Sequence, residues 1–262
     1  MSHRILPTTA VLIPALNESE NIGKVLGQVP TWVAQRVVCD NGSTDDTSLV
    51  AAAAGAQVVH EPRRGYGAAC HAAYQFALQN SPNAIPEVLV FLDGDNSDDP
   101  TEIDQLVGAL VDGPFDLVIG SRTRGGAEKG ALTALQRFGN WLSCRLTALF
   151  FGVTYTDLGP FRAIRTEALQ RLALNDMGFG WTIQMQVRAA RMGLRIGEVP
   201  VRYRNRLAGR SKVSGSLRGA VGAGTRILFI IFAEAWDAAR TAVSAAATRV
   251  QQRLKRTFFL NG

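Results

Sequence analysis

Two aspartates, Asp93 and Asp95, follow directly after the apolar run Val88–Leu92 and are separated by one glycine. In an extended chain, residues i and i+2 point the same way, so both carboxylates can face a single cation. Oxygen ligands of this kind suit Mg²⁺ or Mn²⁺, which bind carboxylates together with substrate phosphates. Taken alone, the pair is equally typical of a solvated acidic turn, because residues 96–100 continue the polar run.

Polar residues also follow two earlier predicted strands. Asn17 and Glu18 come after the apolar segment 10–14, and Asp40 ends the segment 36–40. The carboxyl ends of parallel strands meet at one edge of an open sheet, where such folds bind their ligands. We therefore expect these side chains and the aspartate pair to line one crevice, which favours a binding site over unrelated acidic loops.

The positions of these residues depend on an alternation of strands and helices in the first half of the chain. Short apolar strands are predicted at residues 10–14, 36–40, 56–60, 88–92 and 115–120, and helices begin near residues 20, 44, 68 and 100. This alternation predicts an α/β fold, a mostly parallel twisted sheet with helices on both faces. The second half is less regular, with a polar, turn-rich insert at 156–162, helices expected at 131–151, 167–172, 182–192 and 217–240, a strand at 194–201 and a basic loop at 202–218.

Charge is distributed unevenly along the 262 residues. Residues 188–262 contain 15 of the 28 Lys and Arg but only 3 of the 22 Asp and Glu, a balance of +12 against −6 for residues 1–187. A cationic end predicts phosphates, anionic lipid or nucleic acid as a partner. We do not expect nucleic acid, because the sequence contains no nucleic-acid-binding motif.

The remaining composition indicates a cytoplasmic protein. Cys39, Cys70 and Cys144 lie far apart without metal or redox spacing, as in a reducing compartment. The sequence shows no secretory signal, and no apolar run approaches the roughly 20 residues of a spanning helix.

Residues 221–236 form an amphipathic segment that covers the protein's own core or lies in a membrane interface. The cations in and after it are Arg226, Arg240, Arg249, Arg253, Lys255 and Arg256. Peripheral contact with the cytoplasmic membrane face is therefore expected, with the core-covering role left open.

Six short motifs occur in a fixed order over about residues 8–218. They are Ile13–Glu18, Asp40–Asp45, Arg64–Ala69, Asp93–Asp95, Gly120–Arg122 and Gly209–Lys212. With these motifs the chain resembles glycosyltransferase family 2, of the nucleotide-diphospho-sugar transferase (glycosyltransferase A-type) fold, and most closely its dolichol-phosphate mannose synthase group. The resemblance implies a catalytic domain at residues 1–218 and an amphipathic, basic helical extension at 219–262.

The resemblance also implies a site for a UDP- or GDP-hexose donor. In similar enzymes, the residues matching Asp93 and Asp95 hold Mg²⁺ or Mn²⁺ on the donor diphosphate, and the one matching Asp40 hydrogen-bonds the base. Those matching Gly65 and Gly67 let the backbone lie close to the nucleotide. The full donor set implied here is Pro14, Leu16, Asn17, Glu18, Asp40, Asn41, Ser43, Arg64, Gly65, Gly67, Asp93, Gly94 and Asp95.

For the acceptor, the resemblance implies basic residues that grip a phosphate. The candidates are Arg122, Arg204, Arg210, Ser211 and Lys212. Gln184 and Gln186 stand where a carboxylate base is expected in relatives that use a hydroxyl acceptor, and these amides favour a phosphate acceptor. Asp157 is the candidate base or acceptor-positioning group, and a turn-stabilising role for it is equally open.

Together these features predict metal-dependent transfer of a hexose to a polyprenyl phosphate. Charge develops on the departing diphosphate, and a metal with Arg or Lys stabilises it, so Asp93, Asp95, Asp157 and Arg122 are the candidate catalytic residues. The alternatives are a soluble hydroxyl acceptor and a catalytically inactive nucleotide-binding protein. The oligomeric state stays open, a homo-oligomer included.

Overall fold

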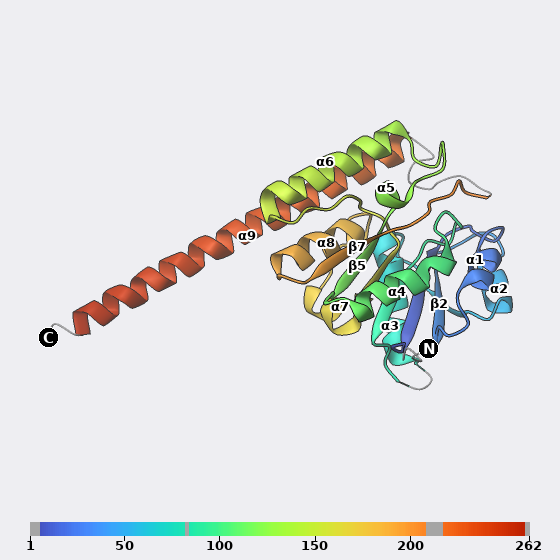
Figure 1. The fold of residues 1–262 in the computed structure, drawn as a ribbon, viewed down its shortest axis with the longest axis horizontal. Coiled ribbons are helices and arrows are strands. Elements are labelled where there is room, and N and C mark those ends of the chain that lie inside the picture. The colour runs from blue at the N-terminus through green and yellow to red at the C-terminus, as the bar shows by residue number, and fades with distance from the viewer. Residues whose placement is uncertain (1–5, 82–83, 208–216, 260–262) are drawn as a thin grey trace.

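The structure is a computed structural model, and it describes residues 6–81, 84–207 and 217–259. Figure 1 shows a central sheet with helices against both faces and a long C-terminal helix, α9, that extends away from this body. The predicted phosphate-binding residues Arg210, Ser211 and Lys212 lie outside the described residues.

The described strands form one seven-stranded sheet in the order β3-β2-β1-β4-β6-β5-β7. They are β1 (Thr9–Ala15), β2 (Gln35–Asp40), β3 (Gln57–His60), β4 (Val88–Phe91), β5 (Leu117–Ser121), β6 (Arg162–Arg165) and β7 (Ile196–Pro200). β1 pairs in parallel with β2 and β4, β2 with β3, and β5 with β7. The predicted α/β fold with a mostly parallel sheet is confirmed.

Apolar side chains pack into two cores, one on each face of the sheet. In β1, Ala10 and Leu12 enter one core while Val11 and Ile13 enter the other. The central strands read as continuous apolar runs because both of their faces are covered. The first core lies under α3 (Tyr66–Gln79), α7 (Thr166–Leu172) and α8 (Trp181–Arg191), and the second under α1 (Ile22–Gln28), α2 (Thr47–Ala53) and α4 (Ile103–Asp112).

The strand β6 was not expected from the sequence. It lies between β4 and β5 and is antiparallel to both, directly after the segment predicted to be a polar insert. Its four residues include two arginines, so it lacks the alternating pattern that marks a strand. Arg162 is nevertheless buried, and its guanidinium donates to the carbonyl oxygens of Pro160 (3.3 Å), Gly159 and Thr182 (3.0 Å).

The helices α6 (Ala134–Phe151) and α9 (Leu217–Phe259) lie side by side along one edge of the body (Figure 1), after the short helix α5 (Arg122–Gly125). The predicted end of the last helix at residue 240 is wrong, because the helix continues to Phe259. The continuation passes through an alanine-rich segment, and alanine is the strongest helix former. No helix among the described residues has the length and apolar content needed to cross a bilayer.

An apolar contact and an ion-pair cluster fasten α9 to α8. Ile230 and Ile231 are buried against Ile183 and its neighbours. Glu234, also buried, accepts hydrogen bonds from Arg188 Nε at 2.6 Å and from Arg191. The first part of α9 is thereby packed onto the surface of the α/β body.

Candidate active site

A cavity of about 1360 Å³ opens at the carboxyl ends of the parallel strands. The predicted site residues that line it are Pro14, Leu16, Glu18, Asn41, Arg64, Gly65, Asp93, Gly94, Asp95 and Arg122. The structure thus brings residues that follow β1, β2 and β4 together at one edge of the sheet. The other described candidates are not among the lining residues: Asn17, Asp40, Ser43, Gly67, Asp157 and Arg204.

Asn17 and Ser43, which do not line the cavity, connect the loops after β1 and β2 through hydrogen bonds. The backbone N–H of Asn17, which has a φ of +52°, donates to Ser43 Oγ at 2.9 Å. The N–H of Thr44 donates to Asn17 Oδ1 at 2.8 Å, and the N–H of Glu18 donates to Thr47 Oγ1 at 2.8 Å. These contacts fix the backbone from which Leu16 and Glu18 reach the cavity.

Asp40 lies at the end of β2 with its carboxylate satisfied by nearby groups. Ser43 N–H donates to its Oδ1 at 2.7 Å, Ser48 Oγ donates to its Oδ2, and His60 Nδ1 lies 3.7 Å from the same oxygen. Burial by itself would raise the pKa of Asp40, but the hydrogen bonds from Ser48 and Ser43 hold it below the ordinary value. Asp40 is therefore a fixed anion beneath the cavity wall.

The glycine turn before α3 packs against another part of the protein. Gly67 N–H donates to Gly178 O at 2.9 Å, and a Cβ atom at Gly67 would lie 2.1 Å from Asp176 O. Gly65, with a φ of +146°, would place a Cβ atom 2.1 Å from Met177 O. The segment 176–180 therefore requires both glycines, whether or not a nucleotide lies against them.

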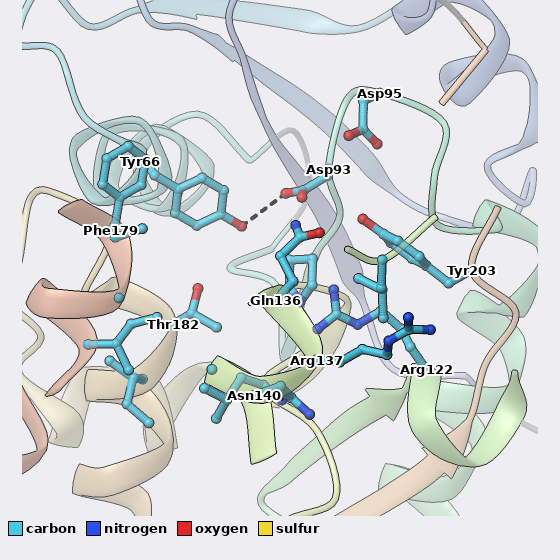
Figure 2. A pocket seen from close by; sticks show the side chains of 18 of the residues that line it. Tyr66, Asp93, Asp95, Arg122, Gln136, Arg137, Asn140, Phe179, Thr182 and Tyr203 are labelled. Atoms are coloured by element: carbon cyan, nitrogen blue, oxygen red, sulfur yellow. Dashed lines mark hydrogen bonds between the residues drawn. The ribbon is translucent and has the colours of Figure 1, made fainter. Parts of the chain in front are cut away.

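The Asp93–Asp95 pair lies in the cavity with different partners for each carboxylate. Tyr66 Oη donates to Asp93 Oδ1 at 3.1 Å, as Figure 2 shows. Asp95 accepts from Ser97 N–H at 2.9 Å and is also paired with Arg206, which donates to Glu18 Oε1 at 2.9 Å through its other nitrogen. Arg206 thus closes a bridge between the loops that follow β1 and β4.

The charge state of the pair fits a cation site. Burial, and next the negative charge of Asp95, raise the pKa of Asp93 to about 7. A divalent cation would relieve this repulsion. Within the described residues, no third His, Cys, Asp or Glu completes a ready-made ligand set with them. Such an ion would take its other ligands from phosphate and water, as Mg²⁺ and Mn²⁺ commonly do.

A third acid, Asp98, lies beneath the pair and was not predicted as a site residue. It is 1% exposed, and neither of its carboxylate oxygens makes a well-formed hydrogen bond within the described residues. Burial, followed by the charges of Asp93 and Asp95, raises its pKa well above the ordinary value, so we infer a neutral carboxyl group. Residues 96–100, whose polar sequence by itself is typical of a solvated turn, are buried in the structure.

The basic segment after β7 pairs with these acidic residues. Arg204 pairs with Asp99, and Arg202 lies 3.2 Å from both Asp99 Oδ2 and Glu102 Oε1. Arg204 was predicted to bind phosphate, but the structure places its guanidinium on Asp99 and outside the cavity lining. These pairs fix the loop that delivers Arg206 to the cavity.

Arg122 and Asp157 form a buried two-point ion pair. Arg122 Nε lies 2.8 Å from Asp157 Oδ2, and its Nη2 lies 2.7 Å from Oδ1. The Asp157 side chain is 1% exposed, whereas Arg122 lines the cavity with its guanidinium 5.0 Å from the ring centroid of Tyr203. With both oxygens occupied, Asp157 is placed to orient Arg122 rather than to accept a proton from a substrate.

A family model for glycosyl transferase family 2 matches residues 10–173, which include the aspartate pair and the Arg122–Asp157 ion pair. The chain belongs to this family. It is therefore a glycosyltransferase, and the predicted family is confirmed.

Relatives of this glycosyltransferase extend the match over most of the chain. An uncharacterised glycosyltransferase of Mycobacterium tuberculosis is 39% identical over 211 residues, which cover 80% of this chain and 92% of the relative. The polyprenol monophosphomannose synthase of Mycolicibacterium smegmatis is 34% identical over 225 residues, covering 79% and 82%. This similarity supports the predicted likeness to the dolichol-phosphate mannose synthase group.

A solved structure with the same fold is glucosyl-3-phosphoglycerate synthase from Mycobacterium tuberculosis, in complex with Mn²⁺, UDP and glucosyl-3-phosphoglycerate. It superposes with a TM-score of 0.66 at 25% identity, covering 87% of this chain and 80% of that chain. The glycosyltransferase A-type fold of the present enzyme is confirmed.

The glycosyltransferase cavity also contains residues that the sequence analysis missed. Gln136, Arg137 and Asn140 of α6 line it together with Phe179 and Thr182 (Figure 2). A capping box at Thr133 and Gln136 begins α6. The spacing of Arg137 and Asn140, three residues apart on one helix, is the only sequence signal for this wall.

Gln184 and Gln186, compared above with a catalytic carboxylate, lie outside the cavity lining and are buried. Gln184 Oε1 accepts from the N–H groups of Asn175 (3.0 Å) and Asp176 (2.9 Å). Gln186 Nε2 donates to Asp157 O at 3.0 Å. Both amides therefore hold loops in place.

Proposed function

We propose that this glycosyltransferase moves a hexose from a UDP- or GDP-sugar to a polyprenyl phosphate in a reaction that requires Mg²⁺ or Mn²⁺. The observation that carries the proposal is the composition of the cavity of about 1360 Å³ at the carboxyl ends of the strands. One end holds Asp93 and Asp95, and the other combines apolar side chains, Leu132, Trp141 and Ile227 among them, with arginines. A nucleotide-sugar fits the end with the aspartates, and a polyprenyl phosphate fits the other end.

At the donor end, Asp93 and Asp95 would hold the divalent ion against the donor diphosphate, and Tyr66 would orient Asp93. The bound ion supplies positive charge where the leaving group becomes more negative. The Mn²⁺ and UDP in the related synthase structure support this assignment. Arg206 already lies on Asp95 and Glu18, within the cavity, and brings a second positive charge to the same place.

At the acceptor end, Arg122 and Arg137 line the cavity and are the proposed phosphate ligands. Arginine suits this role because its planar donors match phosphate oxygens. The carboxylates among the described lining residues are Glu18, Asp93 and Asp95, which leaves no separate base at this end. A phosphate acceptor needs none, since its oxygen is already an anion that attacks the anomeric carbon as the nucleoside diphosphate leaves.

The relatives support the same acceptor. A polyprenol monophosphomannose synthase is 34% identical, and the product in its name carries mannose on a polyprenol phosphate. An acceptor of this kind is membrane-borne, so we propose that the enzyme works as a peripheral protein on the cytoplasmic face of a membrane. We further propose residues 1–218 as the catalytic domain and 219–262 as its extension.

The test is a transfer assay with the full chain, labelled UDP- and GDP-hexoses, and three acceptors: a short-chain polyprenyl phosphate, the corresponding polyprenol, and 3-phosphoglycerate. We expect transfer to polyprenyl phosphate only, dependent on Mn²⁺ or Mg²⁺ and abolished by EDTA. Transfer to 3-phosphoglycerate alone would replace the lipid acceptor with a soluble one. Binding of the donor without transfer to any acceptor would favour an inactive nucleotide-binding protein.

Variants assign the two ends of the cavity. Arg137→Ala should raise the KM for the acceptor with little effect on the affinity for the nucleotide, because Arg137 lies on α6 at the acceptor end. Arg171→Ala, on the exposed surface of α7, is the matched control and should leave both constants unchanged. An equal loss of nucleotide affinity in Arg137→Ala would contradict the assignment.

A further inference from the structure

The helices α6 and α9 carry an apolar surface that the rest of the described chain leaves uncovered. Of fifteen large apolar side chains exposed in the described residues, ten lie on these two helices. The most prominent are Phe138, Trp141 and Leu149 of α6 and Phe229, Phe232 and Trp236 of α9. Single exposed apolar residues are ordinary, but a concentrated group on one surface indicates an interaction site.

These side chains form one continuous surface, called here the α6–α9 face. The two helices lie side by side (Figure 1), and the ring centroids of Phe150 and Phe232 are 5.5 Å apart across their junction. On α9, residues 229, 232 and 236 are spaced three and four apart, as on one side of a helix. Phe138 and Trp141, also three apart, stack at 5.9 Å on α6.

Exposed arginines continue the same rows. Arg145 follows Trp141 by four residues, and Arg240 follows Trp236 by four residues. Neither forms an ion pair with a carboxylate among the described residues. The sequence of α6 contains no acidic residue, and the two acids of α9, Glu234 and Asp237, both pair with Arg191 of α8. The α6–α9 face is therefore apolar and positively charged.

The cavity opens beside this face. Leu135 and Trp141 are both exposed on α6 and part of the cavity wall. Ala223 and Ile227 of α9 also line the cavity. A chain molecule that leaves a bilayer at this face can thus enter the cavity along apolar side chains.

We propose that the α6–α9 face docks on an anionic lipid bilayer and delivers the acceptor directly into the cavity. The inference deepens the proposed function, on which it rests for the nature of the acceptor. Aromatic and aliphatic side chains beside arginines are the composition of helices that lie in a membrane interface. A second copy of the chain fits less well, because a twofold contact would place Arg145 and Arg240 against the same positive surface.

The test uses the full chain and sedimentation with vesicles of phosphatidylcholine, with or without phosphatidylglycerol. We expect binding only when phosphatidylglycerol is present, and weaker binding as salt rises. The double variant Phe232→Ser/Trp236→Ser should lower the partition coefficient at least about tenfold, since each loses a large apolar group from the interface. Leu49→Ser, on the exposed surface of α2, is the matched control and should bind like the wild type.

A charge variant tests the arginines separately. Arg240→Glu should weaken binding about tenfold or more, because it removes one attraction to anionic lipid and adds a repulsion. Arg171→Glu on α7 is its control. Equal vesicle binding by the wild type and both face variants would overturn the proposal. So would a concentration-dependent dimer, seen by analytical ultracentrifugation, that the Phe232→Ser/Trp236→Ser variant abolishes.

Vesicle binding does not depend on the sugar-transfer assay, so the two proposals fail separately. The Phe232→Ser/Trp236→Ser variant should keep wild-type transfer to a water-soluble short-chain acceptor in detergent, because neither residue lines the cavity. It should lose transfer to a long-chain acceptor in vesicles. Loss of both activities, with the fold intact, would show that the face acts on the site itself and would contradict a docking role.

Discussion

Replacing Gly67 by alanine should destabilise the protein and weaken nucleotide binding together. The added Cβ atom would lie 2.1 Å from Asp176 O and 2.9 Å from the Met177 carbonyl carbon. Both neighbours are backbone atoms, so a rotamer change does not relieve the overlap. The segment 176–180 must move away from α3, and the turn that carries Gly65 must move with it.

The magnitude follows from the contacts that such a shift breaks. Gly67 N–H donates to Gly178 O, and Ala68 N–H donates to Met177 O, each at 2.9 Å. We expect the free energy of unfolding to fall by about 2–4 kcal/mol. Two lost hydrogen bonds and an overpacked contact lower it, and the helix propensity of alanine partly offsets this loss. For a chain of this size, this corresponds to a lowering of Tm on the order of 10 °C.

The assay is thermal unfolding with and without UDP and Mn²⁺. Gly67→Ala should have a lower Tm and a smaller ligand-induced rise, because a ligand that binds only the folded form stabilises it less when it binds more weakly. Gly27→Ala, in α1 with open space around its Cβ, is the control and should be neutral or slightly stabilised. If Gly67→Ala melts and binds UDP like Gly27→Ala, the inferred close contact does not exist.

Four other predictions concern charged groups. In Asp95→Ala, Mn²⁺ should no longer add to the rise in Tm that UDP causes. The rise measured with UDP and without metal should stay as in the wild type. Mn²⁺ affinity should fall by up to about tenfold for each pH unit below 7, since Asp93, with its pKa of about 7, must lose a proton to bind the ion; isothermal titration calorimetry checks this. The stability of the metal-free protein should change with pH in the opposite direction to Mn²⁺ affinity. Because the pKa of Asp93 is raised in the folded state, the free energy of unfolding should increase as the pH falls from 7 toward 4. This increase should be smaller in Asp93→Asn. Asp157→Asn should cost about 3 kcal/mol of stability by leaving Arg122 buried without its anion, and chemical denaturation measures it.

The polar edge of the sheet could be predicted because its signals are local. Val88–Leu92 is apolar throughout, and a strand buried on both faces is the main structure with that pattern. Asp93 and Asp95 follow it directly, so their position at the carboxyl end needed no tertiary information. The same reasoning placed Glu18 and Asp40 near them.

Contacts between distant parts of the chain could not be predicted in this way. Arg206 meets Glu18 and Asp95 from 188 and 111 residues away. Such a pairing leaves no periodic pattern, and an arginine in a basic loop reads equally well as a ligand for phosphate. The burial of Asp98 could not be predicted for the same reason, because Tyr203, with which it forms an isolated β-bridge, lies about a hundred residues further on.

The burial of certain polar side chains in the core could not be predicted either. Gln184 and Gln186 were compared with a catalytic carboxylate, yet their amides bond to backbone groups of neighbouring loops. Arg162 likewise begins a buried strand with a charged residue. Sequence patterns describe which residue types are buried on average. Gln184, Gln186 and Arg162 are exceptions, because specific hydrogen bonds satisfy their buried polar groups.

The ion pair between Arg226 of α9 and Asp176 has a thermodynamic consequence. Arg226 Nε lies 2.7 Å from Asp176 Oδ2. Asp176 O is also the atom nearest to a Cβ atom added at Gly67, at 2.1 Å. One short loop is therefore shared by the helix that we propose to face the lipid and the turn that we propose to face the nucleotide. Because thermodynamic coupling is reciprocal, if bilayer binding changes the nucleotide affinity by some factor, nucleotide binding must change the bilayer affinity by the same factor.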